Sequence, residues 1–400
     1  MSDADQFNET LRRRERVTEE KHPPGFEPGL EYGGDTATGS VAADDADLGP
    51  GELPDEEWLI HRFGLNPDTW SIIDGTLNVR QWQRYDGQWQ HYFRAQLRRR
   101  QPAELAISKL ILDRTAKRPP VKKSRRIKAD GSYSVLITDQ QIGKSQGGGV
   151  DGFIARFADS IDAAVHRYQE LLERGWKLPH IGLYFGGDII EGIGGNYASQ
   201  PFQIELGMRD QIEIASATSD YAIDRFAEFG VPVDAVFVPS NHGEQRSGKS
   251  IATEERDSTD LIVADQLRRA YDKNPRRYGH VNVVVPWGNH TTVCIDTPGG
   301  PVGLAHSHQT GRKKTSQWWK DQIAGGVERP LHRARVLFVG HLHHLHIEEV
   351  ADGRFLVQGP ALDGGSMYFT EFAGESSPPG VVTCVVADGV PRELELVRSR

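Results

Sequence analysis

The chain has 400 residues, of which 37% are hydrophobic and 26% are charged, and its formal net charge is -9. This composition suffices for a packed core and for more than one structural unit. The negative net charge argues against a protein that binds nucleic acid through overall positive charge. The two cysteines, Cys294 and Cys384, lie far apart in sequence. That spacing excludes a disulfide framework and a thiolate zinc site, and it fits a reducing compartment.

The beginning of the chain, residues 1–10, is polar and charged and contains no apolar signal core. No apolar run in the sequence approaches the roughly 20 residues that a membrane helix needs. We therefore expect a soluble, cytoplasmic protein that does not associate with a membrane.

Three different segments are expected before the main domain. Residues 1–52 are acidic and rich in Gly, Asp and Pro, and their few large apolar residues predict a disordered tail. Residues 53–115 combine a short amphipathic helix with aromatic runs separated by turns, which suggests a small module of winged-helix type. Residues 116–131 are expected to form a basic linker to a larger domain at residues 132–400.

The larger domain alternates apolar strands with helices and then continues as a run of strands. Apolar runs that end in polar residues predict strands at 133–138, 181–185 and 233–238. Amphipathic segments predict helices at 153–174, 208–229 and 251–271. The later predicted strands lie at 281–285, 292–295, 302–305, 336–339, 347–350, 354–357 and 381–386. This order predicts a layered domain of the α/β class.

Polar residues cluster directly after several of these strands. The carboxyl ends of neighbouring strands form the binding crevice of an α/β domain, so we expect the clusters to meet there. The clusters are five blocks at residues 138–143, 187–191, 240–244, 304–308 and 340–343. Their carboxylate, amide and imidazole ligands suit manganese, iron or zinc better than calcium. A shared aspartate can bridge two such cations, which together polarise a phosphate and activate a water.

The order of these blocks resembles the signature D-x-H, G-D-x-x-[DE], N-H, H and G-H-x-H of calcineurin-like metallophosphoesterases. Residues 133–360 contain all five blocks in the order of that family. The resemblance implies a layered α/β/β/α sandwich and two divalent cations, with manganese expected first and iron or zinc as alternatives. It also implies hydrolysis of phosphate esters.

The resemblance assigns a role to each matching residue. The first metal would be held by Asp139, Gln141, Asp188 and His343. The second metal would be held by Asp188, Asn241, His306 and His341, so that Asp188 bridges the two. His242 would be the general acid that protonates the leaving oxygen, and Glu191 would orient it.

This sequence departs from the signature at Gln141, where the family has histidine. An amide oxygen is a weaker metal ligand than an imidazole, so the affinity and identity of the first metal are open. The acidic residue that usually follows N-H comes one position later, as Glu244 behind Gly243. We interpret that shift as loop variation.

Residues 243–250 also match the phosphate-loop pattern G-x-x-x-x-G-K-[ST] between a strand and a helix. The alternative is therefore a nucleotide-binding protein of the P-loop type. It competes with the metal site for one loop and leaves the other four blocks unexplained. In either case Arg246 and Lys249 are candidates for contact with substrate phosphate.

Residues 94–128 are strongly basic and follow several aromatic residues. They form either a solvated linker or a strip that contacts nucleic-acid phosphates. Four candidate phosphate contacts lie within it: Lys122, Lys123, Arg125 and Arg126. The segment at residues 358–366 resembles phage-encoded DNA-repair exonucleases of the SbcD type.

The leading hypothesis is thus a metal-dependent DNA nuclease or phosphodiesterase. The alternatives are a phosphomonoesterase that acts on proteins or small molecules, and a non-catalytic scaffold that binds nucleic acid. DNA is the expected partner, and the sequence leaves open a homo-oligomer or a partner ATPase.

Overall fold

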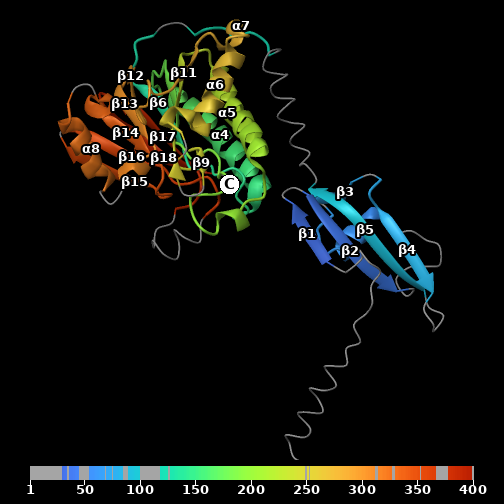
Figure 1. Ribbon diagram of the computed structural model, residues 1–400. Helices are drawn as coiled ribbons and strands as arrows, with labels where there is room; N and C mark the ends of the chain where they lie inside the picture. Colours follow the sequence, from blue (N-terminus) through green and yellow to red (C-terminus); the bar gives the residue numbers. More distant parts are fainter. Residues whose placement is uncertain are drawn as a thin grey trace, which may run out of the picture. The chain divides into compact units, whose positions relative to one another are not determined.

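The computed structural model divides the chain into two compact units, Met1–Ala103 and Glu104–Arg400, whose elements are labelled in Figure 1. The structure describes residues 29–33, 36–44, 54–67, 69–73, 75–83, 89–99, 118–124, 127–247, 250–251, 253–310, 314–326, 329–351, 353–365 and 377–398. Among these residues, no helix is long and apolar enough to cross a membrane.

The described part of the first unit is an antiparallel sheet with one short helix. Helix α2 spans Glu56–Arg62, and its N-terminus is capped by Asp55. The strands are β1 (Gly29–Gly33), β2 (Thr36–Asp44), β3 (Trp70–Ile72), β4 (Asn78–Gln83) and β5 (Trp89–Arg99). The long strand β5 pairs with β2, β3 and β4. Buried Phe93, Ala95 and Leu97 on β5 pack with Leu59 and Ile60 of α2.

This unit corrects two predictions. The expected disordered tail includes β1 and β2, which form a hairpin through five paired positions. The tail prediction is wrong there because β2 pairs with β5, and so much order comes from residues distant in sequence. The sheet of β1 to β5 with α2 is also unlike the helix-rich winged-helix arrangement expected for residues 53–115. The remainder of residues 1–52 lies outside the described residues.

The second unit contains a six-stranded sheet in the order β11-β8-β7-β6-β17-β18. Its strands are β6 (Ser132–Ile137), β7 (Ile181–Phe185), β8 (Val233–Phe237), β11 (Val281–Val284), β17 (Val381–Ala387) and β18 (Val390–Val397). Strands β6, β7, β8 and β11 run parallel, whereas β17 and β18 are antiparallel additions at one side. Helices α4 (Gly149–Glu173), α5 (Met208–Ala227) and α6 (Thr259–Tyr271) connect the parallel strands.

A second sheet has the order β12-β13-β14-β16-β15. Its strands are β12 (Thr292–Thr297), β13 (Gly300–Ala305), β14 (Val336–Val339), β15 (His346–Ala351) and β16 (Arg354–Gln358). Helix α8 (Thr315–Ala324) packs on this sheet through buried Trp318 and Trp319, which contact a cluster containing Leu337 and Leu356. These tryptophans are therefore core residues and are not available to stack on bases.

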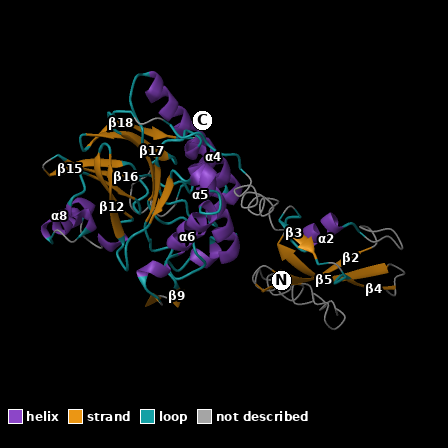
Figure 2. Ribbon diagram, turned by 90° about the horizontal axis from the view of Figure 1, so that it is seen from above, coloured by secondary structure: helices purple, strands orange, loops and turns teal. Residues whose placement is uncertain are grey.

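Three hydrophobic clusters separate the layers of this unit. One lies between the two sheets and joins Leu136 and Tyr184 to Leu304 and Phe338, with the Tyr184 and Phe338 rings 4.8 Å apart. A larger cluster packs α4, α5 and α6 on the opposite face of the first sheet. Figure 2 shows α8 on one side of the strands and α4, α5 and α6 on the other. The predicted α/β class is therefore confirmed.

Most predicted elements of this unit agree with the structure to within a few residues, but one helix does not. Residues 251–271 were expected to be helical throughout, whereas α6 begins at Thr259. The preceding residues form the short strands β9 (Arg246–Ser247) and β10 (Ser250–Ile251) and the turn η2 (Glu255–Asp257). Helix α8 and strand β18 were not expected from the sequence.

Candidate metal centre

All five polar blocks lie at carboxyl ends of parallel strands. Asp139 follows β6, Asp188 follows β7 and Asn241 follows β8. In the second sheet, His306 follows β13 and His341 follows β14, and these two strands are also parallel. The segments are tied together by backbone hydrogen bonds from Asp139 N to Gly187 O at 3.1 Å and from Gln141 N to Asp188 O at 2.9 Å. Residues from five distant segments thus reach one place.

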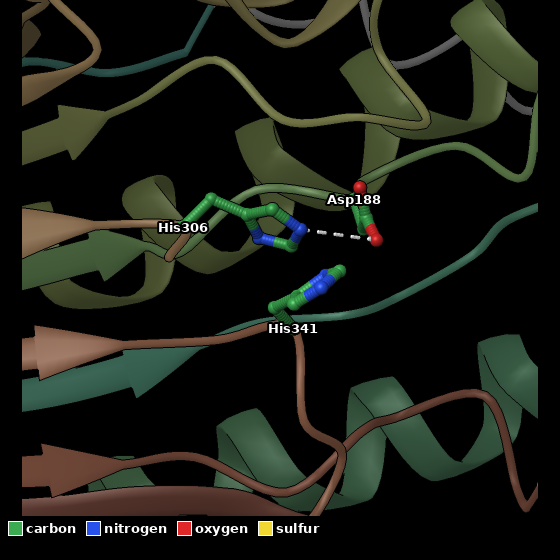
Figure 3. A group of neighbouring side chains, drawn as sticks. All are labelled: Asp188, His306 and His341. Atoms are coloured by element: carbon green, nitrogen blue, oxygen red, sulfur yellow. Dashed lines mark ion pairs between the residues drawn. The ribbon is translucent and has the colours of Figure 1, made fainter. Parts of the chain in front are cut away.

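One group of potential ligands forms around Asp188, His306 and His341, whose ligand atoms lie within 4.8 Å of one another. Figure 3 shows the three side chains converging, with His306 Nε2 3.2 Å from Asp188 Oδ2. The same nitrogen lies 2.9 Å from Asn241 Oδ1. His306 Nδ1 donates to Gly186 O at 2.7 Å, which leaves Nε2 facing the other ligands.

A second group consists of Asp139, Asp188 and His343, so Asp188 belongs to both. His343 Nε2 lies 3.3 Å from Asp139 Oδ1. Both oxygens of Asp139 accept a hydrogen bond from the backbone N–H of His341 at 3.0 Å. Gln141 reaches this group through its amide nitrogen, which lies 3.4 Å from His343 Nε2. The structure therefore brings together all seven side chains that the sequence singled out.

The backbone is strained at most of these positions. Eight non-glycine residues among those described have positive φ angles, and five of them are predicted ligands: Asp139, Gln141, Asp188, His341 and His343. A left-handed conformation costs a non-glycine residue about 1 kcal/mol or more, so it persists only where the surroundings enforce it. Such outliers cluster at functional sites, which supports a functional role for this edge of the sheets.

Glycine is required where two of the blocks approach one another. A Cβ atom at Gly340 would lie 2.0 Å from Thr138 Oγ1 and 2.8 Å from Asp139 Oδ2. One at Gly187, where φ is +90°, would lie 2.7 Å from His306 Nδ1. The glycines that precede Asp188 and His341 therefore permit the close packing of the ligand-bearing loops.

Charge within the site favours a cation. Burial raises the pKa of Asp188, but the imidazoles of His306 and His242 outweigh burial and hold that pKa well below its usual value. Burial lowers the pKa of His306, but Asp188 outweighs it and raises the pKa to about 9. Burial next to His306 lowers the pKa of His341 to about 4. Ionised carboxylates with imidazoles in a buried site fit a divalent cation such as manganese, iron or zinc.

His242 points one ring nitrogen at Glu191 and the other toward the ligands. Its Nδ1 lies 2.7 Å from Glu191 O and 3.5 Å from Glu191 Oε2, and its Nε2 lies 4.0 Å from Asp188 Oδ2. Tyr197 donates to Glu191 Oε1 at 2.6 Å, and Gln200 Nε2 donates to Glu191 O at 2.7 Å. Glu191 therefore orients His242 mainly through its backbone carbonyl, a detail that the sequence did not predict.

Asp260 is a buried residue of this region that the sequence analysis missed. It accepts hydrogen bonds from Ser240 Oγ at 2.5 Å, Ser258 Oγ at 2.9 Å and Ile189 N at 3.1 Å. Asp260 thereby joins the loop after β7 to the loop after β8. In the sequence it is only an acidic residue in the first turn of α6, a common position that carries no functional signal.

The loop at residues 243–250 does not have the geometry of a phosphate loop. In that motif the helix begins at the Lys-Ser pair, whereas Ser250 lies in β10 and pairs with Ser247 of β9. The P-loop alternative is therefore wrong. Arg246 forms an ion pair with Glu244 and donates to Gly195 O at 3.5 Å, while Lys249 lies outside the described residues.

The basic strip is divided between the two units. Arg94, Arg98 and Arg99 are exposed residues of β5 in the first unit. Lys122 and Lys123 are exposed in the second unit, where Ser124 N donates to Gly230 O at 2.9 Å just before β8. They therefore lie at the amino ends of the parallel strands, and the candidate metal centre lies at the carboxyl ends. Arg125 and Arg126 lie outside the described residues.

Comparisons with known proteins give little further guidance. No family model matches the chain, and no curated protein matches it. Among solved structures, the chain is similar to a double mutant of Vps29 from Entamoeba histolytica, with 16% sequence identity and a TM-score of 0.21. That match covers 41% of this chain and 99% of the other. We therefore derive the chemistry of the site from its own side chains.

Proposed function

We propose that the second unit is a metal-dependent phosphoesterase with the layered fold of the calcineurin-like family. The observation that carries this proposal is the convergence of seven potential ligands, from five strand ends, on the shared carboxylate of Asp188. Backbone strain at five of these ligands supports a site built for function. Two divalent cations, with manganese as our first expectation, would supply Lewis acidity and an activated water when bound.

The protein side chains divide the work. Asp139, Gln141, Asp188 and His343 would hold one cation, and Asp188, Asn241, His306 and His341 would hold the other. The shared carboxylate sets the separation of the cations, and the surrounding buried residues exclude bulk water.

His242 is the proposed general acid. Its Nδ1 is held by Glu191 O, so Nε2 is the nitrogen that faces the ligand group. A proton on Nε2 would pass to the oxygen of the leaving group as the phosphate ester breaks. Glu191 and Tyr197 keep the ring in that orientation.

We further propose a phosphodiester of DNA as the substrate, cleaved by an exonuclease-type activity. Phe202 is 89% exposed on the loop after β7 that also contains Tyr197, the partner of Glu191. An exposed aromatic ring beside a phosphate-cleaving site can stack on a nucleobase. Arg246, anchored to the same loop through Gly195 O, adds positive charge. A phosphomonoesterase is the second candidate, because a two-metal site alone does not select diesters.

The test begins with metal analysis of the purified protein and continues with two model esters. Manganese-dependent hydrolysis of bis-(p-nitrophenyl) phosphate is expected, and faster hydrolysis of p-nitrophenyl phosphate would favour the phosphomonoesterase. Labelled single- and double-stranded oligonucleotides then test the DNA proposal, with Phe202→Ala expected to reduce cleavage of DNA but not of the nitrophenyl ester. Absence of hydrolysis with manganese, iron and zinc would overturn the proposed function and favour a non-catalytic scaffold.

A further inference from the structure

A buried lysine lies beside the ligands of the first metal. Lys144 is 6% exposed, and its Nζ lies 3.0 Å from Gln141 Oε1 and 2.5 Å from Asp363 Oδ2. Asp363 is also buried, on the segment that follows β16. A buried ammonium is stable only with compensating partners, and here one carboxylate and one amide oxygen serve that purpose.

This contact fixes the orientation of Gln141. An ammonium can only donate hydrogen bonds, so the amide must present its oxygen to Lys144. The amide nitrogen is consequently the end that lies 3.4 Å from His343 Nε2. A protonated amide nitrogen does not ligate a metal, and the one oxygen that can do so already accepts from an ammonium. The first metal thus keeps Asp139, Asp188 and His343 as its full-strength ligands.

The second metal is better provided. It shares Asp188 and adds two imidazoles, His306 and His341. Its amide ligand is also oriented favourably, because Asn241 Oδ1 lies 2.9 Å from His306 Nε2 on the side of the other ligands. The two halves of the centre therefore differ in the number of ligands and in the charge of their immediate surroundings.

We propose that Lys144 makes the two cation sites unequal, so that the second site fills first and the first site fills only at higher free metal. The Lys144 ammonium repels a cation bound among Asp139, Asp188 and His343, and Asp363 compensates only part of that charge. Hydrolysis, if the proposed function holds, would then depend on the supply of metal to the weaker site. The inference rests on that function only for this consequence and not for the binding itself.

Direct manganese titration of the intact chain tests the inequality. Isothermal calorimetry or the paramagnetic resonance signal of free manganese should show two dissociation constants that differ by about tenfold or more. Lys144→Met should tighten the weaker site by about tenfold or more and leave the stronger site within about twofold. Two equal affinities in the wild-type protein, or an unchanged weaker site in Lys144→Met, would overturn the proposal.

Two further variants guard against ambiguous results. Lys144→Met leaves Asp363 buried without its partner, so the double variant Lys144→Met/Asp363→Asn removes both charges and is titrated in parallel. It should still tighten the weaker site, because Gln141 is then free to turn its oxygen inward. Lys128→Met, an exposed position, is the matched control and should leave both constants unchanged.

Gln141→His separates Lys144 from the missing imidazole as the cause. With Lys144 in place, we expect this variant to leave the first site weaker than the second. Equal affinities in Gln141→His would assign the difference to residue 141 alone and overturn the role of Lys144. Unequal binding without any ester hydrolysis would refute the proposed function and leave this inference intact, whereas hydrolysis with equal binding would do the reverse.

Discussion

The two edges of the first sheet of the second unit both bury charged side chains, but they do so in different ways. At the amino edge, Arg118 pairs with Asp220 at 3.1 Å and with Asp224 at 3.3 Å. Arg277 binds Asp224 through two hydrogen bonds of 2.7 and 2.9 Å, and Tyr278 joins the same network. These residues have negative φ angles. Each charge faces an opposite charge in unstrained backbone.

At the carboxyl edge the balance is different. Asp139 and Asp188 are fully buried and face imidazoles instead of guanidinium groups. Their backbone lies in the left-handed region, which ordinary packing does not require. The comparison teaches that buried charge alone does not indicate function. A network that is neutralised internally holds the fold together, whereas an acidic and imidazole-rich group on strained backbone is suited to bind a cation.

The largest expected effect comes from the shared carboxylate. Asp188→Ala should remove both cations and reduce hydrolysis to background, because Asp188 alone belongs to both ligand groups. His343→Ala should weaken mainly the first cation. Elemental analysis after dialysis measures both results, and equal metal content in Asp188→Ala and wild type would contradict the proposed centre.

His242→Ala should lower kcat by roughly 10²–10⁴-fold with nearly unchanged metal content, since a general acid acts in the transition state. The loss should be smaller for esters with good leaving groups, which need less protonation. Steady-state kinetics with nitrophenyl and alkyl phosphodiesters provide the measurement. His346→Ala, at an exposed position of β15, is the control and should retain wild-type kcat. Loss of metal in His242→Ala would show that this histidine is a ligand.

The amino edge should respond in stability and not in chemistry. Asp224→Ala leaves two arginines without a principal partner, and breaking such a buried pair costs about 3–5 kcal/mol. Urea denaturation should show this decrease in the free energy of unfolding, while kcat per folded molecule stays constant. Asp162→Ala breaks the exposed pair with Arg225 and should cost about 1 kcal/mol or less. A large loss of kcat in Asp224→Ala would remove the distinction between the two edges.

The smallest effect is expected for the exposed lysines of the amino edge. Replacing Lys122 and Lys123 by Met should leave hydrolysis of nitrophenyl esters unchanged, because the five-residue strand β7 separates the edges by about 15 Å. If both lysines contact DNA phosphates, the slope of log affinity against log salt should fall by about two units. Binding titrations at several salt concentrations measure it. Unchanged affinity and slope would exclude this part of the strip from DNA binding.

Much of the candidate site is legible in the sequence. Asp139, Asp188 and His306 each follow an apolar run directly, and parallel strands bring their carboxyl ends to one edge. Only the residue types and their positions relative to the strands are needed for that prediction. Most helices and strands of the second unit were predicted for the same reason, because burial on one face imposes a periodicity on the local sequence.

Tertiary structure alone decided the features that depend on contacts between distant residues. Strand β2 was taken for part of a disordered tail because its order comes from pairing with β5. Lys144 gains its importance from Asp363, which lies more than 200 positions away and is brought near by the second sheet. The composition of the basic strip was plain, but the hydrogen bond to Gly230 O put Lys122 and Lys123 at the edge away from the metal ligands. Local sequence records which side chains a strand or loop offers, and only the closure of long loops determines which of them meet.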